Sequence, residues 1–185
     1  EWVIRSAIAE CARWPEGFVS INLSTRHFQS PNLSAFLAQE AAICGLPHDR
    51  IQLEITETAL FDDSQLAAQI LIALRRQGFR IALDDFGTGY SSLVNLKDFE
   101  IDCIKIDQSF VSKLGIDSTS SAIVHAVTSL ARALGLKVVA EGVESEIQVQ
   151  ALRLTGCELM QGYYFSEAMP SHTLFATGEQ TRKSA

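Results

Sequence analysis

The chain has 185 residues, 47% of them apolar, and a formal net charge of −7. This length and apolar content suit a single domain with a substantial core. The negative charge argues against a protein that binds polymeric nucleic acid through a broad basic face. No stretch contains the roughly 18 uninterrupted apolar residues that cross a bilayer, so we expect a soluble protein.

The cysteine pattern indicates a reducing compartment. The four cysteines are spread singly, with no C-x-x-C pair and no metal-finger spacing. Reduced and mostly buried thiols are therefore expected. Together with a first segment that lacks the layout of a secretory signal, this predicts a cytoplasmic location, although a parent protein could be anchored in a membrane.

Helices and short apolar runs are predicted to alternate along the chain. One helix is expected within residues 1–14, and four more are expected over residues 34–44, 64–77, 118–134 and 145–155. A glycine follows each of these four, which is typical of a residue that ends a helix in the left-handed conformation. The six runs predicted to be strands lie at residues 18–24, 51–57, 80–89, 103–107, 137–144 and 159–165.

This alternation favours a parallel sheet covered by helices. An open doubly wound sheet and a closed (β/α)8 barrel are the two alternatives. The glycine-rich phosphate-binding motifs of open sheets are absent from the sequence. Polar residues at the ends of all six strands favour the barrel, where strand ends meet at one mouth. Because eight strands are needed, we expect a TIM-like α/β barrel that lacks its first two strands in this chain.

Each predicted strand ends with a charged or amide residue. A carboxylate or lysine is costly to bury alone, so several that converge on one place predict a paired or metal-bound cluster. Oxygen donors suit Mg²⁺ or Mn²⁺ better than Zn²⁺. A pair of aspartates can instead cap a turn, but the same pattern on several strands favours a metal site. The strand-end residues are Asn22, Glu54, Asp84, Asp85, Lys105, Glu141 and Gln161.

Strand alternation separates two glutamates of one segment. Glu54 shares a face with Gln52 and Thr56, whereas Glu57 lies on the opposite face unless the strand has already ended. Glu54 is therefore the better metal ligand. Glu57 is predicted to hold a neighbouring loop, with a solvent-facing carboxylate as the alternative.

A lysine in an apolar strand is a second unusual feature. Lys105 lies between Ile104 and Ile106, and Asp107 follows on the same face. A surface salt bridge between Lys105 and Asp107 is one interpretation. The other places the ammonium in the barrel mouth, where it could hold a water or a phosphate oxygen. The histidines lie outside all strand ends, so we predict no catalytic histidine.

Six motifs in order resemble the EAL-domain cyclic di-GMP phosphodiesterases of bacteria. They are INLS at 21–24, LEITET at 53–58, IALDDFGTGYSSL at 81–93, IKIDQSFV at 104–111, VVAEGVES at 138–145 and GCELMQGYYFS at 156–166. The resemblance implies an N-terminally incomplete EAL-type barrel over residues 1–170 and a C-terminal tail over residues 171–185. It also implies hydrolysis of cyclic di-GMP to linear pGpG with two Mg²⁺ or Mn²⁺ ions.

The resemblance assigns roles to individual residues. By similarity, Asn22, Glu54 and Asp84 would hold one metal ion, and Asp84, Asp85 and Glu141 would serve the second. Lys105 would position the attacking water, and Glu141 is a candidate base.

Further residues would support the site by the same similarity. Glu144 and Gln161 would complete its surroundings, with Asp107 nearby. Glu57 would anchor the loop that runs from Phe86 to Ser92. The remaining loop residues assigned to the site are Gly87, Thr88 and Gly89.

One departure from the family pattern keeps a second function open. No E-A-L tripeptide occurs in the sequence, although its glutamate is a metal ligand in the family. A catalytically inactive EAL-like domain that binds cyclic di-GMP or a protein partner is therefore the alternative. The intact strand-end positions favour the enzyme. We also expect fusion to GGDEF or sensor domains, and homodimerisation or other self-association through open sheet edges.

Overall fold

The computed structural model describes residues 1–28, 30, 32–61, 64–87 and 99–174. Its helices are α1 (Trp2–Cys11), α2 (Thr25–Phe28), α3 (Leu33–Cys44), α4 (Glu57–Phe61), α5 (Ser64–Arg76), α6 (Gln108–Val111), α7 (Ser118–Leu134), α8 (Glu146–Thr155) and α9 (Ser171–Leu174), with a 3-10 turn η1 (His48–Arg50). Its strands are β1 (Val19–Leu23), β2 (Ile51–Thr56), β3 (Arg80–Phe86), β4 (Cys103–Ile106), β5 (Lys137–Ala140) and β6 (Leu159–Met160).

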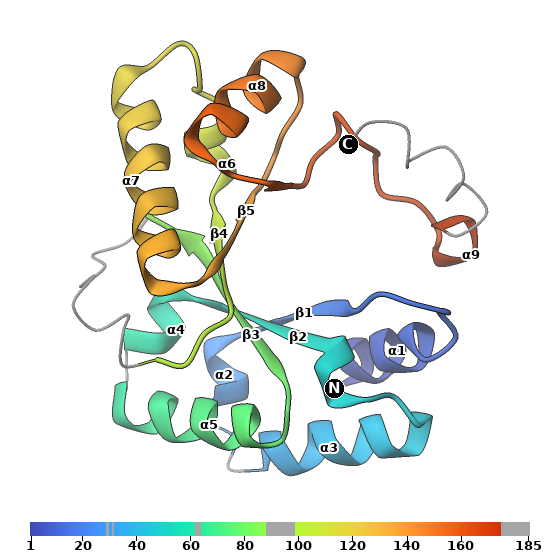
Figure 1. Ribbon diagram of the computed structural model, residues 1–185. Helices are drawn as coiled ribbons and strands as arrows, with labels where there is room; N and C mark the ends of the chain where they lie inside the picture. The colour runs from blue at the N-terminus through green and yellow to red at the C-terminus, as the bar shows by residue number, and fades with distance from the viewer. Residues whose placement is uncertain (29, 31, 62–63, 88–98, 175–185) are drawn as a thin grey trace.

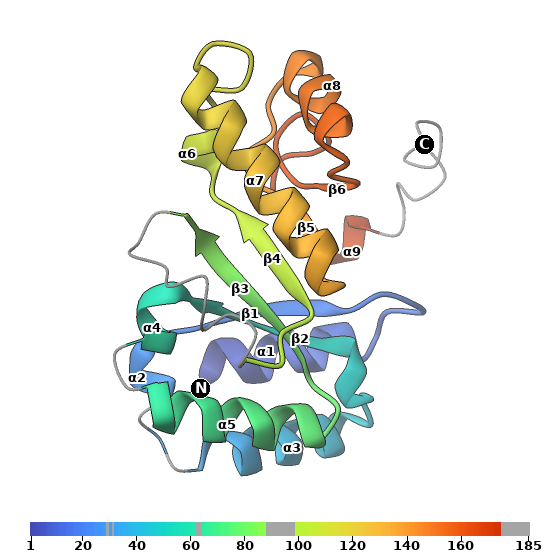
Figure 2. The same ribbon diagram turned by 60° about the vertical axis from the view of Figure 1, so that its left-hand side comes forward.

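The strands form one parallel sheet in chain order, from β1 to β6. Helical segments connect β1 with β2, β2 with β3, β4 with β5 and β5 with β6, and α3 and α5 run side by side along one flank while α7 and α8 lie together near β4 and β5 (Figures 1 and 2). Repeated parallel βα units of this kind build a TIM-like barrel. In the described residues the six strands make an open portion of such a barrel, which confirms the predicted α/β class.

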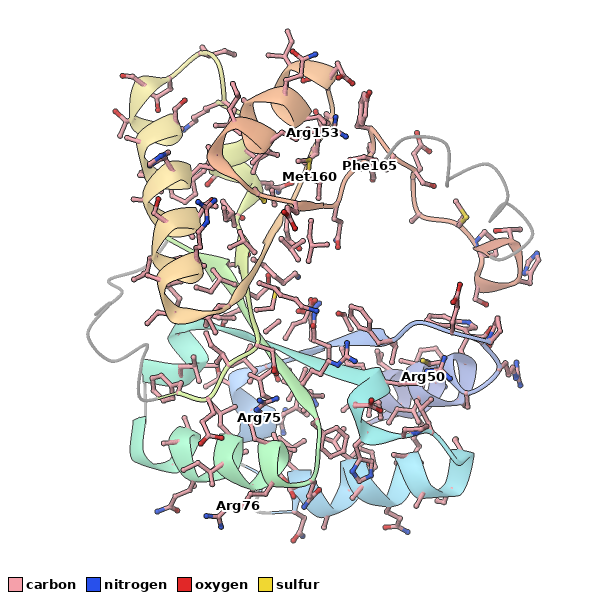
Figure 3. The ribbon with its side chains drawn as sticks, viewed as in Figure 1. Arg50, Arg75, Arg76, Arg153, Met160 and Phe165 are labelled. Atoms are coloured by element: carbon pink, nitrogen blue, oxygen red, sulfur yellow. The ribbon has the colours of Figure 1, made fainter. Side chains whose placement is uncertain are left out.

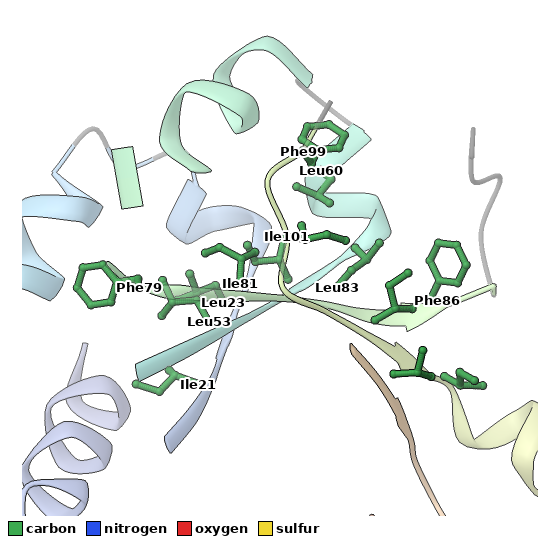
Figure 4. Packing of buried hydrophobic residues seen from close by; sticks show 14 of the residues in the cluster. Ile21, Leu23, Leu53, Leu60, Phe79, Ile81, Leu83, Phe86, Phe99 and Ile101 are labelled. Atoms are coloured by element: carbon green, nitrogen blue, oxygen red, sulfur yellow. The ribbon is translucent and has the colours of Figure 1, made fainter. Parts of the chain in front are cut away.

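Alternate strand positions divide the sheet into an apolar face and a polar face. Ile51, Leu53 and Ile55 of β2 are fully buried and belong to the main apolar cluster, part of which is shown in Figure 4. Because successive side chains of a strand point to opposite faces, the residues between them face away from the helices. In β2 these include Glu54, which the sequence predicted to share a face with Gln52 and Thr56.

The predicted helix ends are confirmed at three glycines. Gly45, Gly135 and Gly156 follow α3, α7 and α8 and adopt the left-handed conformation. Their backbone N–H groups donate to carbonyls of the last turn, which ends each helix a few residues before the next strand. No helix in the described ranges is both long enough and apolar enough to cross a membrane.

One arginine fastens the first helix to the sheet. Arg50, directly before β2, donates to the carbonyl oxygens of Gly17 at 2.7 Å, Trp14 at 3.1 Å and Cys11 at 3.3 Å. Figure 3 shows Arg50 beside α1. These bonds satisfy the carbonyl of Cys11 at the end of the helix and hold the turn that leads into β1.

Candidate active site

A buried lysine joins three carboxylates that lie in or directly after three different strands. The Nζ atom of Lys105 in β4 lies 2.7 Å from Glu54 Oε2, 3.0 Å from Asp84 Oδ1 and 2.7 Å from Glu141 Oε1. Glu54 and Asp84 belong to β2 and β3, and Glu141 directly follows β5. The Lys105 side chain is only 6% exposed. The structure therefore pairs Lys105 with these three carboxylates, so the surface salt bridge with Asp107 was the wrong alternative.

Burial and ion pairing act in opposite directions on these groups. Burial alone would lower the pKa of Lys105, but hydrogen bonds to Glu141, Glu54 and Asp84 outweigh it and raise that pKa above its usual range. Burial raises the pKa of Glu141, while Lys105 opposes the shift. When all four groups are ionised, three carboxylates and one ammonium leave two negative charges uncompensated.

Asp85 reaches the site through an irregularity in the sheet. It has a φ of 54°, in the left-handed region, and the β3–β4 register shifts between Leu83 and Phe86. Such a bulge re-aims a side chain next to a functional site. Burial and the negative charges of Asp84 and Asp107 raise the pKa of Asp85.

The carboxylates of Asp84, Asp85 and Glu141 form a group that fits a divalent cation. Each offers one oxygen, and the three oxygens lie within 4.8 Å of one another. Oxygen donors with excess negative charge suit Mg²⁺, Mn²⁺ or Ca²⁺. Glu54 lies next to this group, because it contacts the same Lys105 ammonium as Asp84.

Glu57 lies beside the start of the predicted site loop. β2 ends at Thr56, so Glu57 begins α4 and the strand-parity argument no longer applies to it. The residue is 5% exposed, which excludes the solvent-facing alternative. Its Oε1 accepts a hydrogen bond from the backbone N–H of Gly87 at 3.0 Å. Phe86 is buried, whereas Thr88 and Gly89 lie outside the described residues.

The other predicted site residues lie around this cluster. Asn22 is exposed and stands opposite Glu54 in the β1–β2 register. Asp107 caps α6 by accepting from the backbone N–H of Ser109 at 3.0 Å. A pocket of about 510 Å³ is lined by Gln108, Glu141, Gly142, Glu144, Gln161, Gly162, Tyr163, Ser166, Glu167 and Ala168. It brings Glu144 and Gln161 next to Glu141.

Sequence reasoning missed Gln108 in this pocket. It begins α6, a helix of four residues that carries no periodic signal. The glycine after Glu141 was the available clue, because Gly142 has a φ of 65° and a Cβ there would lie 2.5 Å from the Cβ of Gln108. A glycine directly after a charged strand end indicates such a close approach.

The parallel barrel-type sheet and the acidic group at its strand ends define an α/β domain with a candidate divalent-metal centre. Residues 1–168 match the EAL domain family model, and the chain belongs to this family.

The relatives are larger proteins. The chain is 43% identical over 175 residues to an uncharacterized signaling protein of Caulobacter vibrioides, covering 94% of the chain and 22% of the relative. It is 37% identical over 182 residues to the bifunctional diguanylate cyclase/cyclic di-GMP phosphodiesterase MucR of Pseudomonas aeruginosa, covering 96% and 27%. The chain thus spans 22% to 27% of the length of these two curated relatives.

Solved structures share the fold. The PaMucR phosphodiesterase in complex with c-di-GMP matches with a TM-score of 0.90 and 36% identity, over 94% of this chain and 72% of that one. A manganese/cyclic di-GMP complex of Klebsiella pneumoniae BlrP1 matches with a TM-score of 0.83 and 34% identity, over 88% of this chain and 42% of that one.

Proposed function

We propose that the chain is a metal-dependent phosphodiesterase that hydrolyses cyclic di-GMP to linear pGpG. The observation that carries this proposal is the group formed by Asp84, Asp85 and Glu141, whose oxygens lie within 4.8 Å of one another beside the buried Lys105. The solved EAL relatives that hold cyclic di-GMP, one of them with manganese, support the choice of substrate and metal.

The acidic residues would divide between two ions, Mg²⁺ or Mn²⁺. Asp84, Asp85 and Glu141 would hold one ion, and Asn22 and Glu54 together with Asp84 would hold the other. When bound, the pair would supply an activated water and a stabilised leaving oxygen. The raised pKa of Glu141 suits this carboxylate to accept the proton of the attacking water.

The neighbouring residues would orient water and substrate. Lys105 would donate a hydrogen bond that positions the attacking water, since its ammonium stays protonated among the carboxylates. Glu144 and Gln161 would contact the substrate in the pocket beside Glu141. Glu57 would support the site by holding the backbone at Gly87.

A second candidate function is binding of cyclic di-GMP, or of a protein partner, without turnover. The observation that favours it is the absence of an E-A-L tripeptide from the sequence. The ligand set around Asp84 favours the enzyme.

The test is an assay of cyclic di-GMP hydrolysis with Mg²⁺ or Mn²⁺, in which pGpG is detected chromatographically. We expect turnover that EDTA abolishes, and a loss of about a hundredfold or more in Asp84→Asn, because this change removes one charged ligand. Circular dichroism of the variant should match that of the parent. Binding of cyclic di-GMP without turnover would favour the second function, and neither binding nor turnover would overturn both.

The likeness to longer relatives extends the proposal to the whole protein. The part of MucR that the chain does not match leaves room for further domains, and its name includes a diguanylate cyclase activity. We propose that this chain is fused to GGDEF or sensor domains. We also propose that it lies in the cytoplasm and that it forms homodimers or otherwise self-associates.

A further inference from the structure

Lys105 occupies the place where the proposed metal ligands converge. We propose that its ammonium is a built-in counter-cation that holds the carboxylate cluster together in the metal-free protein and competes with a divalent ion for the same oxygens. This inference rests on the metal site of the proposed function and assigns Lys105 a second role, distinct from positioning a water.

The first argument is the overlap between two sets of ligands. Asp84 and Glu141 belong to the carboxylate group that fits a divalent cation. The same two residues accept hydrogen bonds from Lys105 at 3.0 Å and 2.7 Å. Two of the three carboxylates in the group are therefore already bound to a cation.

The second argument concerns the charges that would remain without the lysine. Glu54 and Asp84 lie in β2 and β3, Glu141 directly follows β5, and their side chains are only 8%, 12% and 18% exposed. Like charges this close and this buried repel strongly, because little water screens them. Lys105 is the positive charge that contacts all three, so the cluster should stay assembled before any metal arrives.

The third argument concerns what a metal ion must do on arrival. A carboxylate that binds an ammonium at 2.7 Å is partly neutralised, and the ammonium repels a second cation in its neighbourhood. The metal must share or replace these contacts. The lysine should therefore weaken metal binding while it stabilises the metal-free fold.

The direction of the change in metal affinity separates this proposal from simpler roles of Lys105. If Lys105 only orients a water, its removal leaves metal affinity unchanged. If it only supports the ligands, its removal weakens metal binding. The counter-cation role alone predicts a less stable metal-free protein that binds metal more tightly.

The experiment measures Mn²⁺ affinity by calorimetry and melting temperature with EDTA or excess Mn²⁺. Lys105→Met removes the charge, Lys105→Arg keeps it, and Arg75→Met is the matched control. Arg75 forms a part-buried ion pair with Asp102 at 2.7 Å, near the amino ends of β3 and β4, and its position is labelled in Figure 3.

In EDTA we expect Lys105→Met to melt about 10 °C below the parent chain, as for other broken buried ion pairs. Excess Mn²⁺ should restore most of this loss, because a tightly bound ligand stabilises the native state. The Mn²⁺ affinity of the Lys105→Met variant should rise at least about tenfold. Lys105→Arg should resemble the parent, and Arg75→Met should lose stability that Mn²⁺ does not restore.

Unchanged or weaker Mn²⁺ binding by Lys105→Met would overturn the proposal, while normal binding by the parent would leave the proposed function standing. No Mn²⁺ binding by the parent would overturn both. If Lys105→Met fails to fold in EDTA, refolding in the presence of Mn²⁺ would support the proposal. Failure to fold under both conditions would contradict it.

Discussion

At the residue scale, Glu57 shows how one carboxylate connects two segments of the site. It begins α4 and accepts a hydrogen bond from the N–H of Gly87. We predict that Glu57→Ala lowers the rate of cyclic di-GMP hydrolysis about ten- to hundredfold, as the loss of comparable supporting bonds does. Glu57→Gln should be milder, because its amide oxygen can still accept the bond. Equal rates in the two variants would contradict this role.

A second prediction at this scale concerns the backbone next to Glu141. Gly142 has a φ of 65°, and a Cβ there would lie 2.5 Å from the Cβ of Gln108. We predict that Gly142→Ala costs about 3 kcal/mol of unfolding free energy, because strain and overpacking add, and that it also lowers activity by displacing Glu141. Urea denaturation measures the first effect.

Gly135→Ala is the matched control for this prediction. Gly135 also has a positive φ, 72°, but a Cβ added there would meet nothing within 4 Å. Only the backbone penalty of about 1 kcal/mol should remain, and activity should stay unchanged. A comparable loss of activity in both variants would show that proximity to Gln108 is unimportant.

At the element scale, the cap of α8 offers a test of local stability. Ser145 Oγ accepts from the N–H of Gln148, and Gln148 Oε1 accepts from the N–H groups of Ser145 at 3.0 Å and Glu144 at 2.7 Å. We predict that Ser145→Ala costs about 1 kcal/mol. Gln148→Ala should cost more, because two backbone donors lose their partner.

The exposed Gln150 on the same helix provides the control for this pair. Its amide donates an exposed hydrogen bond to Glu146 at 3.3 Å, so Gln150→Ala should change stability by less than about 0.5 kcal/mol. Urea unfolding of the three variants ranks them. A larger effect at Gln150 than at Ser145 would contradict the capping assignment.

The long elements could be predicted from the sequence, but several short ones could not. Apolar periodicity and a closing glycine indicated α3 and α7, which the structure contains. Helices such as α4 and α6 have five and four residues, too few for a period of 3.6 to appear. The strand predicted over 137–144 is longer than the observed strand. β5 ends at Ala140, because the chain turns two residues later at Gly142, which has a positive φ.

The partners of Lys105 could not be predicted from the sequence alone. Strand parity placed Glu54 on the polar face, but the ion pairs join residues as far as 51 positions apart. Their distances depend on strand register and on the bulge at Asp85, neither of which leaves a local signal. The convergence of the charged strand-end residues could therefore be predicted from the sequence, whereas their individual contacts could not.

At the scale of the whole molecule, the open sheet has consequences for solution behaviour. In the described residues β1 and β6 each pair with one strand. Phe18, directly before β1, is 43% exposed, and Leu159, in β6, is 46% exposed. Unpaired edges with apolar surface favour association. We predict concentration-dependent oligomers in light scattering of the 185-residue chain. A monomer at all concentrations would contradict this.

The sheet also has the same order in space as in the chain. During synthesis, each strand can therefore pair with the strand made just before it, without waiting for a distant segment. The charged cluster can be completed only later in synthesis. Glu54 and Asp84 are made before Lys105, and Glu141 is made last. A nascent chain halted before residue 141 should already contain most of the sheet, yet be unable to close the ring of charges around Lys105.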